Sequence, residues 1–263
     1  MKRVLLPLMI VMVFLILWQT VETYVNELRF AEGRTSLEFF IPTPLTIVKA
    51  GFENYKTIFR AMQQTLIKAS AGFGIGAFLG ISMAVMYSLT PALRSATLPI
   101  AFALQSFPIV GIAPVIILAF GQDSFMSIVI VSVILVYFPI LLSLDDAFTN
   151  MNKEYTELAT VYNASKWQMI RLVKLPLASP SLFTALKLAA PSSIVGATIG
   201  EWLGSSSGIG RMITLAIYQL KPGILYSCLV GRLMCVMPFL DKAWPTADWA
   251  TSASAGATRA WRR

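Results

Sequence analysis

Side chains able to carry out chemistry are scarce in this sequence. It contains no histidine, and its two cysteines, Cys228 and Cys235, lie seven residues apart in an apolar stretch. On a helix that spacing gives a rise of about 10 Å, which is too long for a disulfide. No G-x-x-x-x-G-K-S/T segment is present to cradle the phosphates of ATP. We therefore expect no catalytic residue, no metal site and no cofactor held by this chain.

The composition is typical of a membrane protein. Hydrophobic residues make up 56% of the 263 positions and charged residues only 13%, about half the charged share of a soluble domain. The net charge of +8 is better explained by cytoplasmic loops and anionic lipid headgroups than by nucleic acid, because no long basic run occurs. We expect the chain to lie in a lipid bilayer and to bind no nucleic acid.

Apolar runs divide the chain into about six membrane-spanning helices, each near the ~20 residues that cross a bilayer. The fold class is therefore all-α, a polytopic membrane protein. The expected spans are Val4–Trp18, Leu66–Tyr87, Leu98–Phe120, Phe125–Leu144, Leu182–Leu203 and Ile224–Leu240. An even number of spans places both termini on one side, and the larger number of Lys and Arg residues predicts that this side is cytoplasmic.

The same runs define three regions. Residues 1–64 hold the first span and an amphipathic lead-in helix, Leu45–Gln64, which we expect to enter the membrane as one element. Residues 65–240 form the core, interrupted by a polar cytoplasmic loop at 145–176. Residues 241–263 are rich in Ala, Ser and Thr, and we expect them to be disordered.

Small residues mark a packing face on the second span. Gly72, Gly76 and Gly80 recur every four residues, so they lie on one side of a helix. Such a stripe allows two helix backbones to approach closely, either inside a bundle or at a dimer seam.

Polar residues and prolines in two spans are candidates for a translocation pathway. Prolines free backbone carbonyls, which must then face protein or a wet cavity, although a kink that serves only packing is an equal alternative. Lys187 and Glu201 lie near span ends, where their charged groups can reach the interface by snorkelling. The pathway candidates are Gln105, Ser106 and Pro108 in the third span, and Ser193, Thr198 and Glu201 in the fifth.

The polar loop before the fifth span is the most informative segment. It predicts a helix, a turn and a second helix: Asn163 ends the first helix in a left-handed conformation, Ser165 caps the second, and Pro176 closes the unit. Glu157 is expected to be exposed on the cytoplasmic side. Such a unit suits insertion into a partner's groove, and an ordinary amphipathic interface helix is the alternative.

At these residues the chain resembles the binding-protein-dependent ABC importer permeases, the membrane subunits of bacterial type I importers. Their signature is Glu-Ala-Ala, a glycine six residues after the glutamate, then nine residues, an aliphatic residue, one residue, and Leu-Pro. Leucine and asparagine replace an alanine and the glycine of the signature, and asparagine still allows the positive φ of the turn. The matching positions are Glu157, Leu158, Ala159, Asn163, Val173, Leu175 and Pro176.

The resemblance covers roughly residues 40 to 225. Gln105-Ser106-Phe107-Pro108 and Gly200-Glu201-Trp202-Leu203 resemble the nitrate, sulfonate and taurine branch, and are similar to permeases for thiamine-pyrimidine precursors. After about Tyr226 the chain departs from the family pattern, and we leave open whether that region is native or frameshifted.

The resemblance implies the type I importer transmembrane fold and a role as the permease of an importer in the bacterial inner membrane. It implies two cytoplasmic ATPase subunits, which bind ATP and Mg²⁺, an extracytoplasmic solute-binding protein, and a second permease copy. The polar loop would be the segment that couples to the ATPase. An ion-coupled secondary transporter is the main alternative, and it requires a buried carboxylate relay for which Glu201 is the one candidate. A membrane-embedded enzyme and a non-transporting assembly subunit are less favoured.

Overall fold

The computed structural model describes residues 2–31 and 42–241. Throughout these residues the regular structure is helical and no strand occurs, which confirms the all-α fold class. The predicted tail, apart from residue 241, lies outside the described residues, as does the side chain of Cys235. The elements are α1 Lys2–Ala31, α2 Pro44–Glu53, α3 Tyr55–Leu89, α4 Pro91–Ser106, α5 Ile109–Phe120, α6 Phe125–Thr149, α7 Lys153–Val161, α8 Lys166–Gln168, the π-helix η2 Met169–Lys174, α9 Leu175–Gly204, α10 Ile209–Tyr218 and α11 Pro222–Asp241.

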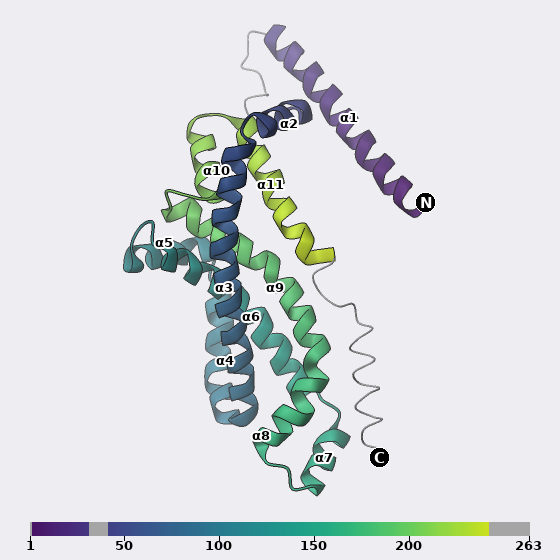
Figure 1. Cartoon of the computed structure of the whole chain (residues 1–263), viewed down its shortest axis with the longest axis vertical. Helices are drawn as coiled ribbons and strands as arrows, with labels where there is room; N and C mark the ends of the chain where they lie inside the picture. The colour runs from purple at the N-terminus through teal and green to yellow at the C-terminus, as the bar shows by residue number, and fades with distance from the viewer. Residues whose placement is uncertain (1, 32–41, 242–263) are drawn as a thin grey trace.

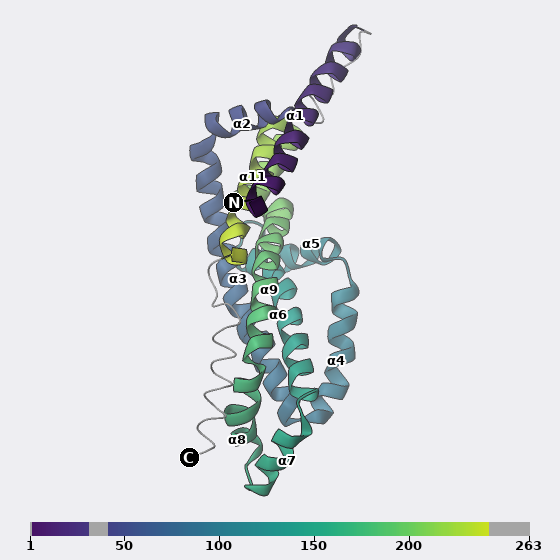
Figure 2. The same ribbon diagram turned by 90° about the vertical axis from the view of Figure 1, so that its right-hand side faces the viewer.

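Three long helices, α3, α6 and α9, run side by side and form the centre of the molecule (Figures 1 and 2). Their shared core consists mainly of apolar side chains, among them Val136, Ile140, Leu141 and Ala189, none of which is exposed to solvent. Helices α7 and α8 lie at one end of this bundle and α2 and α10 at the other (Figure 1). We call these the coupling end and the outer end.

The glycine stripe of α3 packs inside the bundle rather than at a free surface. Gly72, Gly76 and Gly80 are all buried and all face α6. A Cβ added at Gly76 would lie only 2.7 Å from Cβ of Val136, whereas Gly74 beside the stripe has open space around it. The stripe therefore lets the backbones of α3 and α6 approach more closely than any larger side chain would permit.

Helix length and composition give fewer spans than the six expected from the sequence. Among the described residues, three helices are long and apolar enough to cross a membrane: Tyr55–Leu89, Phe125–Thr149 and Lys166–Gly204. The third predicted span is not one helix, because α4 and α5 meet at an angle of 100°. The break falls at Phe107 and Pro108, where the backbone is extended. Proline disfavours helical geometry in the residue before it, which explains the position of the bend.

The N-terminal region also differs from the expectation. Helix α1 does not end near Trp18 but continues to Ala31, since no proline or glycine interrupts it there. The lead-in helix predicted at Leu45–Gln64 is two elements, separated at Asn54. Helix α2 lies across the outer end and α3 then descends along the bundle (Figure 1). Helix α1 leans away from the bundle and has its main contact with α2 (Figure 1).

Candidate functional site

The polar loop forms a compact helical tip at the coupling end, between α6 and α9 (Figure 1). Helix α7 begins after Asn152, whose side-chain oxygen accepts a hydrogen bond from the backbone N–H of Glu154 at 3.2 Å. Glu154 in the first turn also places a negative charge at the positive end of the helix dipole. Local sequence therefore fixes the start of this helix without help from the bundle.

The turn after α7 has the geometry expected of Asn163. This residue has φ of 51°, in the left-handed region. The N–H of Asn163 donates to the carbonyl of Thr160 at 2.9 Å, and that of Ala164 to the carbonyl of Ala159 at 3.0 Å. This pair of bonds is the Schellman motif, which satisfies the last carbonyls of a helix.

The second helix of the tip begins with a capping box. The N–H of Gln168 donates to the side-chain oxygen of Ser165 at 3.3 Å, and the N–H of Ser165 donates to Oε1 of Gln168 at 2.8 Å. Ser165 thus caps the helix as its sequence position predicts, and Gln168 completes the box.

The prediction that Pro176 closes the unit is wrong. The chain stays helical from Lys166 through the π-helix η2 into α9, so that residues Lys166–Gly204 form one 39-residue helical span. Proline removes one N–H and crowds the carbonyl of the preceding turn, and here it occupies the first turn of α9 directly after η2. In η2 the N–H of Leu175 reaches back five residues to Ile170, and this wider turn accommodates the proline.

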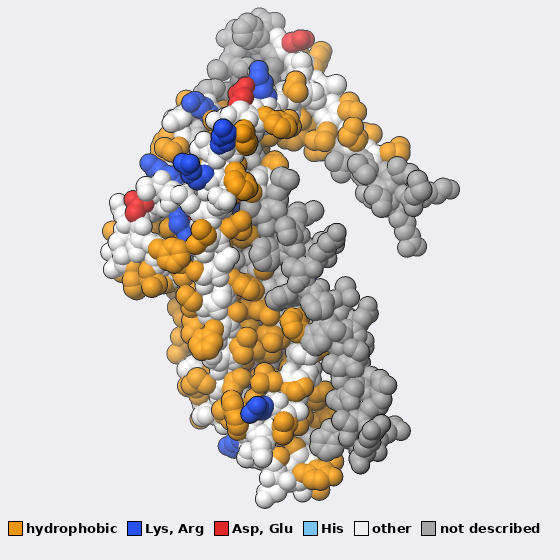
Figure 3. Space-filling model, viewed as in Figure 1, with side chains coloured by type: hydrophobic (Ala, Val, Ile, Leu, Met, Phe, Trp, Pro, Cys, Tyr) orange, Lys and Arg blue, Asp and Glu red, His pale blue; other side chains and the backbone are white. Residues whose placement is uncertain are grey.

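The tip presents an apolar surface to solvent, visible as orange side chains at the lower end of Figure 3. Ala159 and Ile170 face inward and are buried. Glu157 is exposed among the apolar side chains. An exposed apolar patch of this kind is typical of a protein interaction site. We call it the tip surface; its large members are Leu158, Val161, Tyr162, Trp167 and Leu172.

Two polar contacts brace the bundle directly behind the tip. The guanidinium of Arg94 on α4 donates two hydrogen bonds to the carboxylate of Asp145 on α6, at 2.7 and 2.8 Å. Nζ of Lys174 in η2 donates to Oγ of Ser88 at the end of α3, at 2.8 Å. The first contact joins α4 to α6, and the second joins α3 to η2. Sequence reasoning missed the Arg94–Asp145 pair because 51 residues separate its partners.

The six predicted pathway residues occupy two different environments. Gln105, Ser106 and Pro108 are exposed around the bend between α4 and α5. Ser193 and Thr198 are buried in α9, where their hydroxyls donate to carbonyls of the same helix, Ala190 at 2.7 Å and Ile194 at 2.6 Å. The first group is therefore exposed on the surface of the chain, whereas the second is enclosed within the bundle.

The interpretation of Glu201 as a snorkelling side chain is wrong. Its side chain is 0% exposed, and Oε1 lies 2.9 Å from Nζ of Lys68 on α3. The carboxylate therefore contacts a buried lysine and does not reach the membrane interface. The sequence feature that indicates such a pairing is Lys68 itself, a lysine in an otherwise apolar run.

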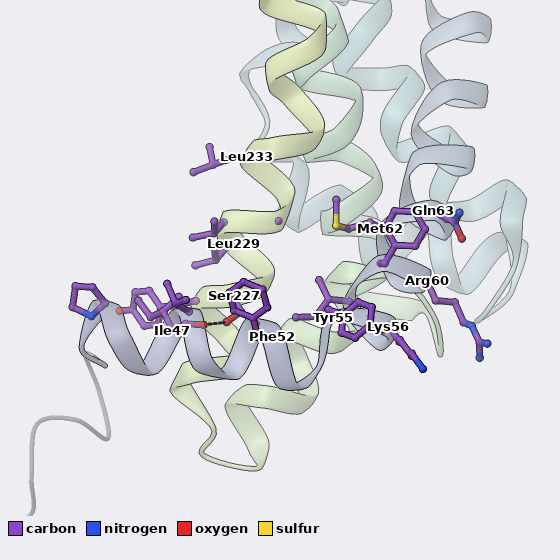
Figure 4. Close-up of a pocket in the computed structure, with 18 of the residues that line it drawn as sticks. Ile47, Phe52, Tyr55, Lys56, Arg60, Met62, Gln63, Ser227, Leu229 and Leu233 are labelled. Carbon is purple, nitrogen blue, oxygen red and sulfur yellow. Dashed lines mark hydrogen bonds between the residues drawn. The ribbon is translucent and has the colours of Figure 1, made fainter. Parts of the chain in front are cut away.

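A large apolar cavity lies at the outer end, between α1, α2, α3 and α11 (Figure 4). Ile47, Phe52 and Leu229 are among its walls, and Oγ of Ser227 donates to the carbonyl of Ile47 at 2.7 Å. None of the pathway candidates lines it. Across the part of the chain that the structure describes, no three His, Cys, Asp or Glu side chains are grouped so that they could hold a metal ion.

Comparison with known proteins decides the family. The family described as "Binding-protein-dependent transport system inner membrane component" matches residues 76–239. The chain belongs to this family. The match includes the whole tip and Glu201, and it extends past Tyr226, where the sequence pattern is weakest. The resemblance seen in the polar loop is therefore confirmed.

Two curated relatives and one solved structure agree with this assignment. A probable ABC transporter permease of Haemophilus influenzae is 28% identical, over 87% of this chain and 89% of its own length. A formylaminopyrimidine transport permease of Halalkalibacterium halodurans is 30% identical, over 76% of this chain and 81% of its own. The inward-facing methionine ABC transporter MetNI superposes with a TM-score of 0.57 at 17% identity, over 70% of this chain and 90% of that one. The last likeness confirms the importer transmembrane fold.

Proposed function

We propose that this chain is the permease subunit of an ABC importer in the bacterial inner membrane, with both termini in the cytoplasm, and that its tip surface docks on a separate ATPase. The observation that supports this most directly is the tip itself. Its two helices are fixed by local caps, yet they expose Leu158, Val161 and Trp167, which nothing in the bundle covers. A rigid unit with exposed apolar side chains fits insertion into a groove of a partner.

In this proposal two permease copies pair with two ATPases, which bind ATP and Mg²⁺, and receive solute from an extracytoplasmic binding protein. Closure of the ATPase dimer would draw the two tips together. The motion would then switch the permease between inward-facing and outward-facing states, as a rigid-body change between two packed arrangements. The residues of the signature, from Glu157 to Pro176, form the coupling segment.

The solute pathway in this proposal passes the bend between α4 and α5. Gln105 and Ser106 have exposed polar side chains there. The nearby Pro108 has no backbone N–H and so interrupts the helical hydrogen bonds at the bend. Ser193, Thr198 and Glu201 support the pathway from inside the bundle rather than by contact with solute, since all three side chains are buried there.

For the solute we propose a pyrimidine precursor of thiamine, because a relative at 30% identity is named as a formylaminopyrimidine permease. Small anions such as nitrate, taurine and other sulfonates are the second candidate. Exposed cations favour them: Lys and Arg side chains gather on the outer end in Figure 3, where such charges would raise the local concentration of an anion. The exposed cations of the outer end include Lys49, Lys56, Arg60 and Lys221.

The test is co-purification. The tagged chain is expressed with its neighbouring genes, solubilised in mild detergent, and assayed for a bound ATPase. Glu157→Lys reverses a charge on the tip, and Asn163→Pro is incompatible with φ of 51° and removes the N–H that bonds Thr160. We expect each variant to reduce the bound ATPase by about tenfold or more. Glu53→Lys, an exposed residue at the outer end, is the matched control and should leave binding unchanged.

Two results would contradict the proposal. One is a wild-type chain that binds no ATPase. The other is uptake driven by a proton or sodium gradient in vesicles without ATP, which would establish ion-coupled transport instead. When the ATPase does bind, its rate of ATP hydrolysis is measured with formylaminopyrimidine, nitrate and taurine in turn, each with the binding protein present. The solute that raises this rate is the transported one.

A further inference from the structure

The outer end of the bundle contains a buried polar cluster whose role the proposed function does not explain. Lys68 on α3 and Glu201 on α9 are 133 residues apart in sequence, and their side chains are 10% and 0% exposed. A buried ion pair is weak evidence for stability, since apolar residues of similar volume often serve equally well. Its presence therefore requires an explanation from geometry.

Each oxygen of the Glu201 carboxylate has a defined partner. Oε1 accepts from Nζ of Lys68 at 2.9 Å, and Oε2 accepts from Oγ1 of Thr65 at 2.7 Å and from the N–H of Gly210 at 3.1 Å. Gly210 is in the first turn of α10, so the carboxylate also interacts favourably with the dipole of that helix. One side chain of α9 thus holds both α3 and α10.

The lysine fastens the loop between α9 and α10. Besides Glu201, Nζ of Lys68 bonds to Oγ of Ser205 at 3.4 Å and to both the carbonyl and Oγ of Ser207 at 3.3 Å. The next residue, Gly208, has φ of +97°, and a Cβ there would collide with the Glu201 carboxylate. Only glycine lets the loop fold this tightly over the ion pair.

Two more bonds from α3 reach the same loop. The N–H of Gly208 donates to Oε1 of Gln64 at 3.1 Å, and the N–H of Ile209 donates to Oγ1 of Thr65 at 2.9 Å. The first N–H groups of α10, which no helical carbonyl can satisfy, are therefore satisfied by side chains from α3 and α9. Helix α10 cannot shift without breaking several of these bonds together.

This cluster lies at the far end of the helix that carries the tip. Helix α9 has 30 residues from Leu175 to Gly204, a length of about 45 Å, and it is continuous with η2 and α8 at the coupling end. A movement of the tip would therefore be transmitted to the outer end through this helix. Whether it moves the outer loop depends on how firmly α9 holds that loop.

We propose that Lys68 and Glu201 form a clasp that joins α3, α9 and α10 into one rigid body, so that movement of the tip displaces the loop at residues 205–208 on the opposite side of the membrane. Lys68 and Glu201 act here as positioning residues: they do not touch solute or nucleotide. The proposal rests on the proposed function, since it takes the tip to be the part that an ATPase moves.

The test must distinguish loss of the clasp from loss of the fold. A variant that removes both charges at once does so, because it leaves no unpaired charge in the bundle. The double variant Lys68→Met, Glu201→Gln keeps both side-chain volumes, and its amide oxygen can still accept a hydrogen bond in place of the carboxylate. Spin labels are placed in the two permease copies, at Lys153→Cys on the tip or at Tyr218→Cys at the end of α10, after replacement of the native cysteines. Distances between labels are measured in the complex with its ATPase, before and after trapping with ATP, Mg²⁺ and vanadate.

In the wild-type background we expect both label pairs to change distance on trapping. In the double variant the tip labels should still move, while the displacement at Tyr218 should fall at least about fivefold. The control, Glu53→Gln, removes a negative charge from an exposed position at the outer end and should behave as wild type. An unchanged displacement at Tyr218 in the double variant would overturn the clasp.

A milder variant covers the case in which the double variant does not assemble. Ser205→Ala with Ser207→Ala keeps the ion pair but removes two hydroxyls that hold the loop to Lys68. It should reduce the displacement at Tyr218 by about twofold or more, and a displacement equal to wild type here would also overturn the clasp. If the tip labels of the wild type do not move on trapping, the proposed function fails, and not the clasp alone.

Discussion

The two ends of the bundle each contain a buried carboxylate paired with a cation, but the pairs differ in their access to water. At the outer end, Lys68 and Glu201 are 10% and 0% exposed. At the coupling end, Asp145 is 6% exposed while its partner Arg94 is 39% exposed. The second pair is bidentate, which is the stronger geometry of the two.

This difference indicates that burial, and not bond geometry, sets how much stability is lost when such a pair is broken. A buried lysine that loses its carboxylate keeps only hydroxyl and carbonyl partners, which bind its charge less strongly. An arginine that already reaches solvent can turn its guanidinium into water and recover its solvation. Breaking the outer pair should therefore destabilise the fold more than breaking the pair at the coupling end.

The largest effect is expected from Glu201→Ala. It leaves Lys68 buried without its carboxylate and removes the acceptor of the Gly210 N–H. The free energy of unfolding should fall by about 3–5 kcal/mol. Thermal unfolding of the purified chain in detergent, followed by circular dichroism, measures the change. Glu53→Ala, at an exposed position, should alter stability by no more than about 0.5 kcal/mol. If Asp145→Ala lowered the free energy of unfolding by the same amount, the two ends would not differ in this respect.

A smaller effect is expected from Asp145→Ala, about 1.5–3 kcal/mol, because the freed Arg94 gains contact with water. The same unfolding measurement is repeated at low salt and at 1 M salt, where the Debye length is about 3 Å. Salt should weaken the contribution of Asp145 and leave that of Glu201 nearly unchanged. The same salt dependence for both carboxylates would show that the outer pair is also reached by solvent.

The smallest effect is expected from a third carboxylate, Asp123, which is exposed at the outer end. Hydrogen bonds from the hydroxyl and the N–H of Ser206 hold the pKa of Asp123 below its ordinary value. A carboxyl whose pKa is lowered by folding stabilises the protein above its unfolded pKa, and this contribution disappears as the pH falls through the folded pKa. Wild type should therefore exceed Asp123→Asn in thermal stability above about pH 5, and the difference should close below about pH 4. A difference that grows on acidification would contradict this assignment.

The features predicted correctly from the sequence are those fixed within a few residues of the chain. Asn163 ends α7 in a left-handed conformation and Ser165 caps the next helix, because both depend on a residue's own backbone preference and on partners three to five positions away. The Glu-Ala-Ala signature that first indicates the family lies in the same short segment. The π-helix beside Pro176 was not predicted, since a widened turn has no residue pattern of its own.

The sequence by itself determined that the chain is helical, apolar enough for a bilayer, and equipped with a capped tip, because apolar periodicity and helix caps act locally. Only the tertiary structure decided that α4 and α5 meet at 100°, that the glycine stripe packs on α6, and that Glu201 is paired with Lys68. For Glu201 the physical reason is that a charged side chain near a span end can be stabilised in two ways, by water or by a buried partner of opposite charge. The choice between them depends on which helix packs alongside, and that helix is 133 residues away in the chain.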